Sequence, residues 1–371
     1  MKIGTDQYNT FDTMTMDCWN DRVYYEGKEF PAGHFAAEIL NFAGVIHDPL
    51  LERITVLTAL VDDLSTAEKN KRHDIAAQLK PLLHDTVSWL YTCPPFCYCE
   101  SQGAYEDIEL ALSGERLDRD YEEEEAHLPY LALSFCEPIL RILVAIYNFC
   151  LLIRTFEMKY LRRSKQRNAD AFAKAAHECF DEDDSFLILL EQMPFGEVEE
   201  FFSYPRVITG FKYFQDENDE EKWKTAQRVI CKRAIDFYVF DLMNGLHHGH
   251  APSQCQGCGK YFLTTNGHIP KYCDGIAPQD SRYTCRQYGA MMHQKEQNKQ
   301  HPVYRLFATR TDTIRKHHQR GKISDDLRRE ALYLAGSYRD KALMDNDYAA
   351  DGYARDMELE HIYAEAEKRL K

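Results

Sequence analysis

The sequence predicts a mainly α-helical protein, with a helical N-terminal domain, a small cysteine-rich module in the C-terminal third and basic helices after it. Three observations support this class. Apolar residues recur at helical spacing over much of the first 250 positions. Four cysteines then cluster between positions 255 and 285, and the balance of charge reverses at the same point.

Length and composition are those of a globular protein. The chain has 371 residues, of which 44% are hydrophobic and 28% charged. This composition excludes a collagenous or wholly disordered protein. The formal net charge of −15 repels nucleic acid and anionic lipid from the molecule as a whole, so any such partner must be met locally.

The sequence favours a cytoplasmic protein that makes no contact with a membrane. Its N-terminus has no basic segment followed by an apolar run, so we expect no secretory signal. The longest apolar run, residues 139–153, contains Arg141 and Asn148 and is shorter than the ~20 residues that cross a bilayer. Twelve scattered cysteines suit reduced thiols, some of them metal ligands, better than a disulfide scaffold.

Residues 1–250 form the predicted helical domain, whose role the sequence does not reveal. A short hairpin with a Glu26-Gly27 turn is expected near its beginning, as a minor decoration. A loop rich in Pro and Cys at 93–99 and an acidic stretch at 118–125 interrupt the helical pattern. Helices are expected at 33–64 and onward to 91, at 130–165 as the central helix, at 169–180, at 185–193, and as one long helix from about 220 to 246.

The domain boundary falls at residues 245–253, where Gly245, Gly249 and Pro252 stop the long helix. Residues 1–250 carry 25 Lys and Arg against 44 Asp and Glu, whereas residues 251–371 carry 20 against 16. The predicted domains are therefore 1–250, a cysteine module at 251–290 and a basic helical segment at 291–371.

The cysteine module has the spacing C-x2-C-x14-C-x11-C, formed by Cys255, Cys258, Cys273 and Cys285. Two thiolates two residues apart can bind one ion, because a tight turn points both sulfurs to one side while its amides hydrogen-bond them. Four sulfur ligands leave zinc no open position. The pattern therefore predicts one structural Zn²⁺, which supplies much of the folding free energy of so small a region.

The segments around these cysteines indicate the fold of the module. An Asn266-Gly267 hairpin between residues 260–263 and 269–272 would return the chain to Cys273. Thr284 can cap a helix that begins at Cys285, whose thiolate would lie near the positive end of that helix. The tight turn that carries Cys255 and Cys258, which we call the knuckle, the hairpin and a ligand on the first helical turn together make the outline of a treble clef. Two alternatives remain open: His268 or His250 replaces one cysteine, or the four are buried thiols without an ion.

The stretch from Cys255 to Gly289 resembles zinc fingers of the CGNR type, in which a C-x2-C-G-x-x-F knuckle precedes an aromatic-Cys pair and a later Cys that opens a basic helix. It is also similar to an uncharacterised zinc-finger family of Firmicutes, with a helical N-terminal part and a basic helical tail. The resemblance implies a bacterial protein that acts as a transcription regulator.

Basic residues follow the last cysteine and are interleaved with Tyr288, Tyr304 and Phe307. Such groups suit phosphate contacts, so we expect DNA or RNA as the partner, with a helix-turn-helix-like element at 302–335 and a helical body that forms a homodimer or senses a ligand. The alternatives are a basic face that packs on the acidic N-terminal domain, and a zinc-stabilised adaptor that binds only protein. The candidate nucleic-acid contacts are Lys260, Arg286, Lys295, Arg315, Lys316, Arg320 and Lys322.

Two weaker signals point to other chemistry. Cys93, Cys97 and Cys99 could join a second metal site, but only three ligands lie there. His-Asp pairs at 47–48, 73–74 and 84–85 are typical of helical metal-dependent hydrolases, although no further His and Asp can be placed with them. Since the sequence has no P-loop, dinucleotide fingerprint or nucleophile elbow, we expect a binding protein rather than an enzyme.

Overall fold

The computed structural model describes residues 13–42, 48–118, 130–164, 166–191, 205–216, 219–265, 267 and 270–370. The chain divides into two compact units, Met1–Lys271 and Tyr272–Lys371, each of which is described by itself. The predicted domains 1–250, 251–290 and 291–371 stay a prediction.

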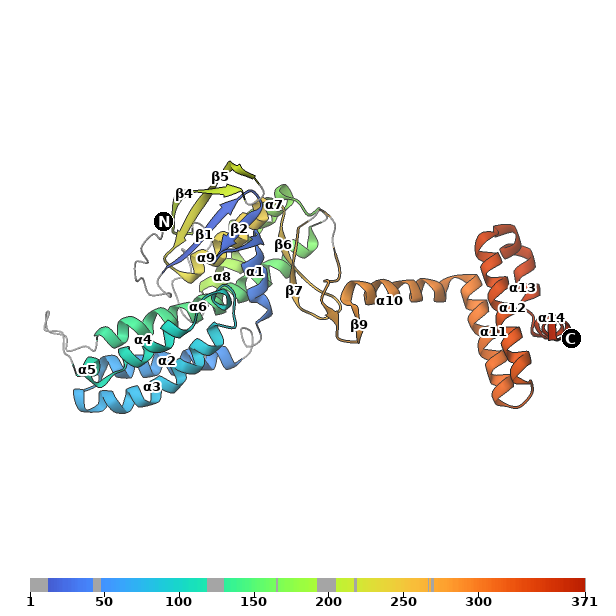
Figure 1. Ribbon diagram of the computed structural model, residues 1–371, viewed down its shortest axis with the longest axis horizontal. Helices are drawn as coiled ribbons and strands as arrows, with labels where there is room; N and C mark the ends of the chain where they lie inside the picture. The colour runs from blue at the N-terminus through green and yellow to red at the C-terminus, as the bar shows by residue number, and fades with distance from the viewer. Residues whose placement is uncertain are drawn as a thin grey trace. The chain divides into compact units, whose positions relative to one another are not determined.

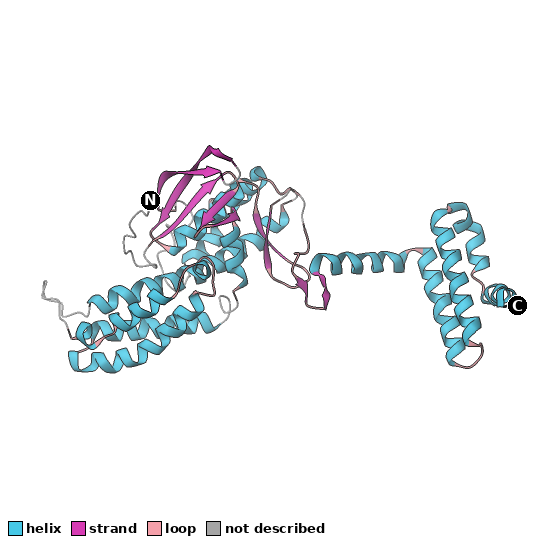
Figure 2. Ribbon diagram, in the orientation of Figure 1, coloured by secondary structure: helices cyan, strands magenta, loops and turns pink. Residues whose placement is uncertain are grey.

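A five-stranded antiparallel sheet lies in the first unit (Figures 1 and 2). Its order is β3-β2-β1-β5-β4, so the strand nearest the N-terminus occupies the centre. This sheet makes the protein mixed α/β, and the prediction of a mainly α fold is wrong. The strands are β1 (Met14–Trp19), β2 (Arg22–Tyr25), β3 (Lys28–Pro31), β4 (Val207–Asp216) and β5 (Asp219–Cys231).

The predicted hairpin exists, but as part of this sheet rather than a decoration. Glu26 and Gly27 both have positive φ, at 45° and 72°, as a two-residue type I′ turn requires between β2 and β3. Its inner side chains, including Val23 and Tyr25, join the main core.

The single helix predicted from 220 to 246 is wrong in its first half. Residues 219–231 form β5, and helix α9 (Ala234–His247) begins only afterwards. The end of β5 has a period of two, because Val229 and Cys231 are buried while Arg228 and Ile230 are partly exposed. Aromatic and β-branched residues favour strands, and Trp223, Thr225, Val229 and Ile230 are residues of this kind within β5.

Helices cover the other parts of the first unit. The predicted central helix is present as α6 (Tyr130–Lys159), and the predicted helix at 169–180 is present as α7 (Ala169–Phe180). The others are α1 (His34–Glu38), α2 (Asp48–Thr66), α3 (Lys69–Leu90), α4 (Gln102–Ala111), α5 (Gly114–Leu117) and α8 (Asp184–Glu191), with short 3₁₀ turns at Ile39–Asn41, Phe96–Tyr98 and Leu161–Arg163.

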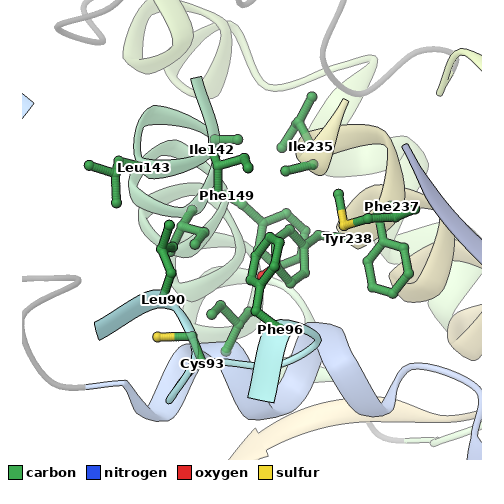
Figure 3. Packing of buried hydrophobic residues seen from close by; sticks show 14 of the residues in the cluster. Leu90, Cys93, Phe96, Ile142, Leu143, Phe149, Ile235, Phe237 and Tyr238 are labelled. Atoms are coloured by element: carbon green, nitrogen blue, oxygen red, sulfur yellow. The ribbon is translucent and has the colours of Figure 1, made fainter. Parts of the chain in front are cut away.

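The core of the first unit is one continuous apolar cluster that α6 and α9 share with the sheet. Figure 3 shows Phe149 of α6 beside Tyr238 of α9, with ring centroids 5.3 Å apart. Within the described residues one segment, Phe135–Arg163, is long and apolar enough to cross a bilayer, which differs from the expectation. Since 61% of its apolar window is buried inside the protein, it has the burial of a core helix.

A close approach joins α9 to the start of α1. A Cβ on Gly245 would lie 2.8 Å from the Cα of Gly33, so no larger residue fits without a shift of backbone. Asp241, one turn earlier, is fully buried and accepts hydrogen bonds of 2.9 Å from the amides of Gly33 and Ala36. Burial raises the pKa of Asp241 to about 7, although these amide bonds act in the opposite direction. The helix stops at Gly249, whose φ is +78°, whereas Gly245 lies inside it.

The second unit contains its own smaller core. Helices α11 and α12 form an antiparallel pair against which α14 packs, and the hydroxyl of Tyr353 donates to the carbonyl of Val303 at 2.9 Å. This core buries ten hydrophobic residues, all between 303 and 366. The elements are β8 (Ile276–Ala277), β9 (Asp280–Thr284), α10 (Cys285–Gln300), α11 (Pro302–Gln319), α12 (Asp325–Met344), a π-helical turn at Tyr348–Gly352, α13 (Tyr353–Asp356) and α14 (Leu359–Leu370).

Candidate metal centre

The four predicted ligands lie together. The sulfur atoms of Cys255, Cys258, Cys273 and Cys285 are all within 4.8 Å of one another. Three of these side chains are buried and that of Cys258 is half-buried. A tetrahedral zinc ion with Zn–S bonds of about 2.3 Å places its sulfur ligands about 3.8 Å apart, so the cluster could hold a metal ion with small adjustments. It is the one group of this kind among the residues that the structure describes.

The first two cysteines lie in a tight turn at the end of a two-stranded hairpin, β6 (Ala251–Gln254) and β7 (Tyr261–Thr264). The amide of Cys255 donates to the carbonyl of Lys260 at 2.8 Å, and that of Gly259, at φ +75°, donates back to the carbonyl of Cys255 at 2.9 Å. The amide of Gly257 donates to the sulfur of Cys255 at 3.3 Å. Amide donors of this kind stabilise a thiolate, as the motif predicted.

The strand pairing in this hairpin differs from the prediction. Strand β7 pairs with β6, which precedes the knuckle, and residues 270–272 form no strand. The predicted turn residue Asn266 lies outside the described residues. Residues 251–254 and 269–272 are both short segments compatible with a strand. The local pattern therefore did not show which of them pairs with residues 261–264.

The other two cysteines are held by a second small hairpin, β8 and β9, and by the start of α10. The amide of Cys285 donates to the carbonyl of Gly275 at 2.7 Å, and the amide of Arg286 donates to the carbonyl of Cys273 at 3.1 Å. These bonds bring the two ligand positions side by side, although eleven residues separate them in the sequence.

A capping box fixes the beginning of α10. The hydroxyl of Thr284 accepts from the amide of Gln287 at 3.2 Å, and the Gln287 side chain accepts from the amide of Thr284 at 3.0 Å. The predicted cap is therefore confirmed, and Cys285 occupies the first helical position, where the helix dipole favours a thiolate. The partner Gln287 was not predicted, although the pattern Thr-x-x-Gln signals it.

The aromatic residue before the third cysteine packs on the same helix. A Cβ added to Gly289 would lie 2.4 Å from the ring of Tyr272, so the ring rests against bare backbone of α10. Gly289 is buried, while the six residues 291–296 that follow in α10 are exposed on every side.

The histidine alternatives gain no support. His250 is 4% exposed and its Nδ1 is bonded to the carbonyl of Ala32 at 3.0 Å, in the first unit's core. His268 lies outside the described residues.

The other cysteines do not form a second metal site within the described part of the chain. The thiol of Cys93 donates to the carbonyl of Trp89 at 3.5 Å, Cys99 is 3.3 Å from the hydroxyl of Tyr25, and Cys97 is exposed. Burial raises the pKa of Cys93 to about 12, so this thiol stays protonated at neutral pH.

The His-Asp pairs also form no metal group among the described residues. His73 and His84 lie on α3 and pair with Asp118 at 3.0 Å and with Glu109 at 2.9 Å, both at the surface. His47 lies outside the described residues.

The predicted nucleic-acid contacts fall into two sets. Lys260 lies in the knuckle, and Arg286 and Lys295 lie on α10. Arg286 is bonded to Asp274 at 3.0 Å, so part of its charge is already matched. The second set lies at the C-terminal end of α11 and in the turn after it: Arg315, Lys316, Arg320 and Lys322.

Comparison with known proteins gives one family and no function. Residues 203–369 match the model of a family of unknown function, DUF6076. No curated protein and no solved structure matches the chain. The match contains all four cysteines and the C-terminal helices but lends no support to the CGNR resemblance.

Proposed function

We propose that this protein binds nucleic acid through its C-terminal region, which a structural zinc ion holds in shape. Four thiolates in a tetrahedral cluster are the ligand set that zinc prefers, and the cluster leaves no position for a reacting water. The ion would therefore fix the start of α10 rather than perform chemistry.

The observation that supports nucleic acid as the partner is a row of exposed cations on α11. Arg305, Arg315 and Lys316 are exposed on α11, and Arg305 and Lys316, eleven residues apart, lie on the same side of the helix. Arg320 and Lys322 continue the row in the turn, around Gly321 at φ +68°. Asp312 lies on the same face and bonds Lys316 at 3.3 Å. We call these five cations the α11 row.

Most of the α11 row has no anionic partner among the described residues. Arg305, Arg315, Arg320 and Lys322 form no ion pair there, whereas Arg328 and Arg329 on α12 are paired with Asp325. Exposed cations without carboxylate partners can exchange condensed counterions of a phosphate backbone, which makes binding favourable and dependent on salt. Residues 302–335, for which a helix-turn-helix-like element was predicted, lie in α11 and α12, which form an antiparallel pair rather than the steeply crossed helices of that motif.

Fluorescence anisotropy of the zinc-loaded protein with labelled duplex DNA and single-stranded RNA, across a salt series, tests this proposal. If all five cations contact phosphates, the plot of log affinity against log salt should have a slope of about −4 to −5 for duplex DNA and about −3.5 for single-stranded RNA. Replacing Arg315, Lys316 and Arg320 together by Gln should make the slope for duplex DNA less negative by about 3 and should weaken binding of every sequence. The matched control is Lys368→Gln on α14, which removes an exposed cation that is already paired with Glu365.

A protein adaptor is the competing function, and α10 provides the observation that favours it. Met291 and Met292 are each 41% exposed, and all six residues of α10 from 291 to 296 are exposed to solvent. Polarizable methionines on an open helix suit a protein partner. An absence of binding to both nucleic acids even at low salt would favour the adaptor over the proposed function.

A further inference from the structure

A buried carboxylate lies on the outer face of the sheet, away from the apolar core. Asp17 of β1 is 8% exposed and pairs directly with Arg228 of β5 in the strand register. It accepts two bonds from Arg228, at 2.7 and 2.9 Å, and one of 3.0 Å from Lys212 of β4. Burial raises the pKa of Asp17, but these bonds outweigh it and hold the pKa below its ordinary value.

This ion cluster lies in a cavity of about 560 Å³, which we call the sheet-face pocket. Pockets of this size hold small organic ligands. The pocket lies wholly within the first unit and does not involve the cysteine cluster or the α11 row. The charged and aromatic residues of its lining include Asp17, Tyr24, Lys212, Phe214, Lys224 and Arg228.

Two cations of the pocket, Arg228 and Lys212, have more donors than Asp17 uses. A guanidinium has five N–H donors and an ammonium has three, and Asp17 uses two of those on Arg228 and one on Lys212. Both side chains are still exposed, at 37% and 47%. Asp17 therefore holds the two cations in place rather than consuming them, and a phosphate with several acceptor oxygens can bind both.

Aromatic rings border the same cavity. The rings of Tyr24 and Phe214 have centroids 5.5 Å apart, and Trp19 meets Phe214 edge-on at 6.4 Å. Lys224, which pairs with Phe214 in the strand register, places its ammonium 4.2 Å from the centroid of Trp19. Aromatic side chains on an open sheet face offer stacking surfaces to a planar ring.

The rim of the pocket carries negative charge. Glu26 lies in the tight turn between β2 and β3, and Glu29 lies on β3, where it forms an ion pair with Arg22 at 3.5 Å; both carboxylates are exposed. A carboxylate there can accept from hydroxyl or amino groups but repels an anion. A fitting ligand therefore has one anionic end, one planar ring and a set of hydrogen-bond donors.

We propose that the sheet-face pocket binds a mononucleotide, with its phosphate on Lys212, Lys224 and Arg228 and its base against Tyr24 and Phe214. The ribose hydroxyls or base amino groups then face Glu26. Among small anions, a nucleotide combines all three features that the pocket offers. If instead the Asp17 cluster only joins β1, β4 and β5, no ligand should recognise these side chains together.

Isothermal titration calorimetry of the zinc-loaded full chain tests this assignment, with AMP, GMP, CMP and UMP as probes. At least one nucleotide should bind at micromolar to sub-millimolar concentration, and its nucleoside and ribose 5-phosphate should each bind at least tenfold more weakly. Lys224→Gln and Phe214→Leu should each lower nucleotide affinity about tenfold and leave the Asp17 bonds in place. Lys232→Gln, an exposed cation at the end of β5 that does not line the pocket, should have no effect.

Three results would overturn the proposal: no heat with any nucleotide at millimolar concentration, equal binding of ribose 5-phosphate, or binding that Lys224→Gln and Phe214→Leu leave unchanged. Circular dichroism melts of each variant exclude unfolding as the cause of a loss. Because DNA binding is measured through the α11 row, failure of the nucleotide titration leaves that proposed function standing, and the reverse also holds.

Discussion

The core of the first unit and the cysteine module fold for different reasons. The first unit buries one continuous cluster of apolar side chains, drawn from the sheet and from α1 to α9. The hairpin β6–β7 joins this core through Ala251 and Tyr261, whereas β8, β9 and the start of α10 bury only Ala277, Gly289 and the two ligands Cys273 and Cys285. The comparison teaches that solvent exclusion stabilises the core, whereas we expect the segment from Cys273 to the start of α10 to need the proposed metal ion for its stability.

Removal of the metal should produce the largest effect and should separate the two regions. Chelation of zinc, or Cys255→Ser, removes an apparent binding free energy on the order of 10 kcal/mol in small zinc modules. Hydrogen exchange followed by mass spectrometry should show loss of amide protection across 273–290, while α6 keeps its protection. Cys97→Ser, an exposed thiol outside the cluster, is the matched control. Unchanged protection of 273–290 in metal-free protein would contradict the assignment of the cysteine cluster.

The buried carboxylate of Asp241 should make the stability of the first unit depend on pH. Its pKa rises to about 7 in the folded state from an ordinary value near 3.8, so the folded state binds more protons between these two pH values. The free energy of unfolding should therefore fall as pH rises from about 4 to about 7, by at most about 1.4 kcal/mol per pH unit for this group.

Urea unfolding of wild type and Asp241→Asn across pH 4.5–8 measures this dependence. The Asn variant lacks the titration, so wild type should lose stability relative to it as pH rises. Asp62→Asn, at an exposed position of α2, should follow wild type. Parallel pH profiles for wild type and the Asp241 variant would show that the carboxyl does not titrate in this range.

Gly245→Ala should destabilise the first unit by about 2–3 kcal/mol, since overpacking of a fixed backbone contact costs energy of this size. The added Cβ meets the backbone of Gly33 rather than a flexible side chain, so it cannot be relieved by a rotamer change. Chemical denaturation measures the loss, and metal affinity should not change. Gly210→Ala in β4, where a Cβ meets nothing within 4 Å, should have little effect or stabilise slightly. Equal midpoints for both variants would contradict the close packing of α9 on α1.

Thr284→Ala should have the smallest effect, and only on the cysteine module. Loss of an N-cap costs about 1 kcal/mol, which corresponds to roughly a fivefold weaker affinity for zinc because the capped helix carries a ligand. Competition with a chromogenic chelator measures this affinity. The matched control is Thr309→Ala on α11, whose hydroxyl bonds the carbonyl of Arg305 inside a helix. An equal loss of zinc affinity in both variants would show that the cap at Thr284 does not contribute to metal binding.

The cysteine module was predictable because its information is local. The spacing of Cys255, Cys258, Cys273 and Cys285 and the cap at Thr284 lie within one stretch of sequence, and metal geometry restricts how such a stretch can fold. The pairing partner of β7 could not be read in the same way, since the segments on both sides of the knuckle are compatible with a strand.

The sheet was not predictable from local pattern. Its central strand β1 pairs with β5, so Met16 lies opposite Val229, and nothing near either residue signals the other. The helical period read into 220–246 came from apolar residues of β5 and α9 taken together. Asp17 was missed for the same reason, because its partners Lys212 and Arg228 become visible only once the strands are adjacent.

The pairing of Met14–Trp19 with Asp219–Cys231 also has a consequence for biosynthesis. A ribosome adds about 5–20 residues per second, so β1 leaves the exit tunnel roughly 10–40 seconds before its partner strand has been made. During that interval the β1–β3 segment has to remain unpaired on one edge, which is where nascent chains aggregate. Closure of the sheet therefore has to wait until β5 has been made.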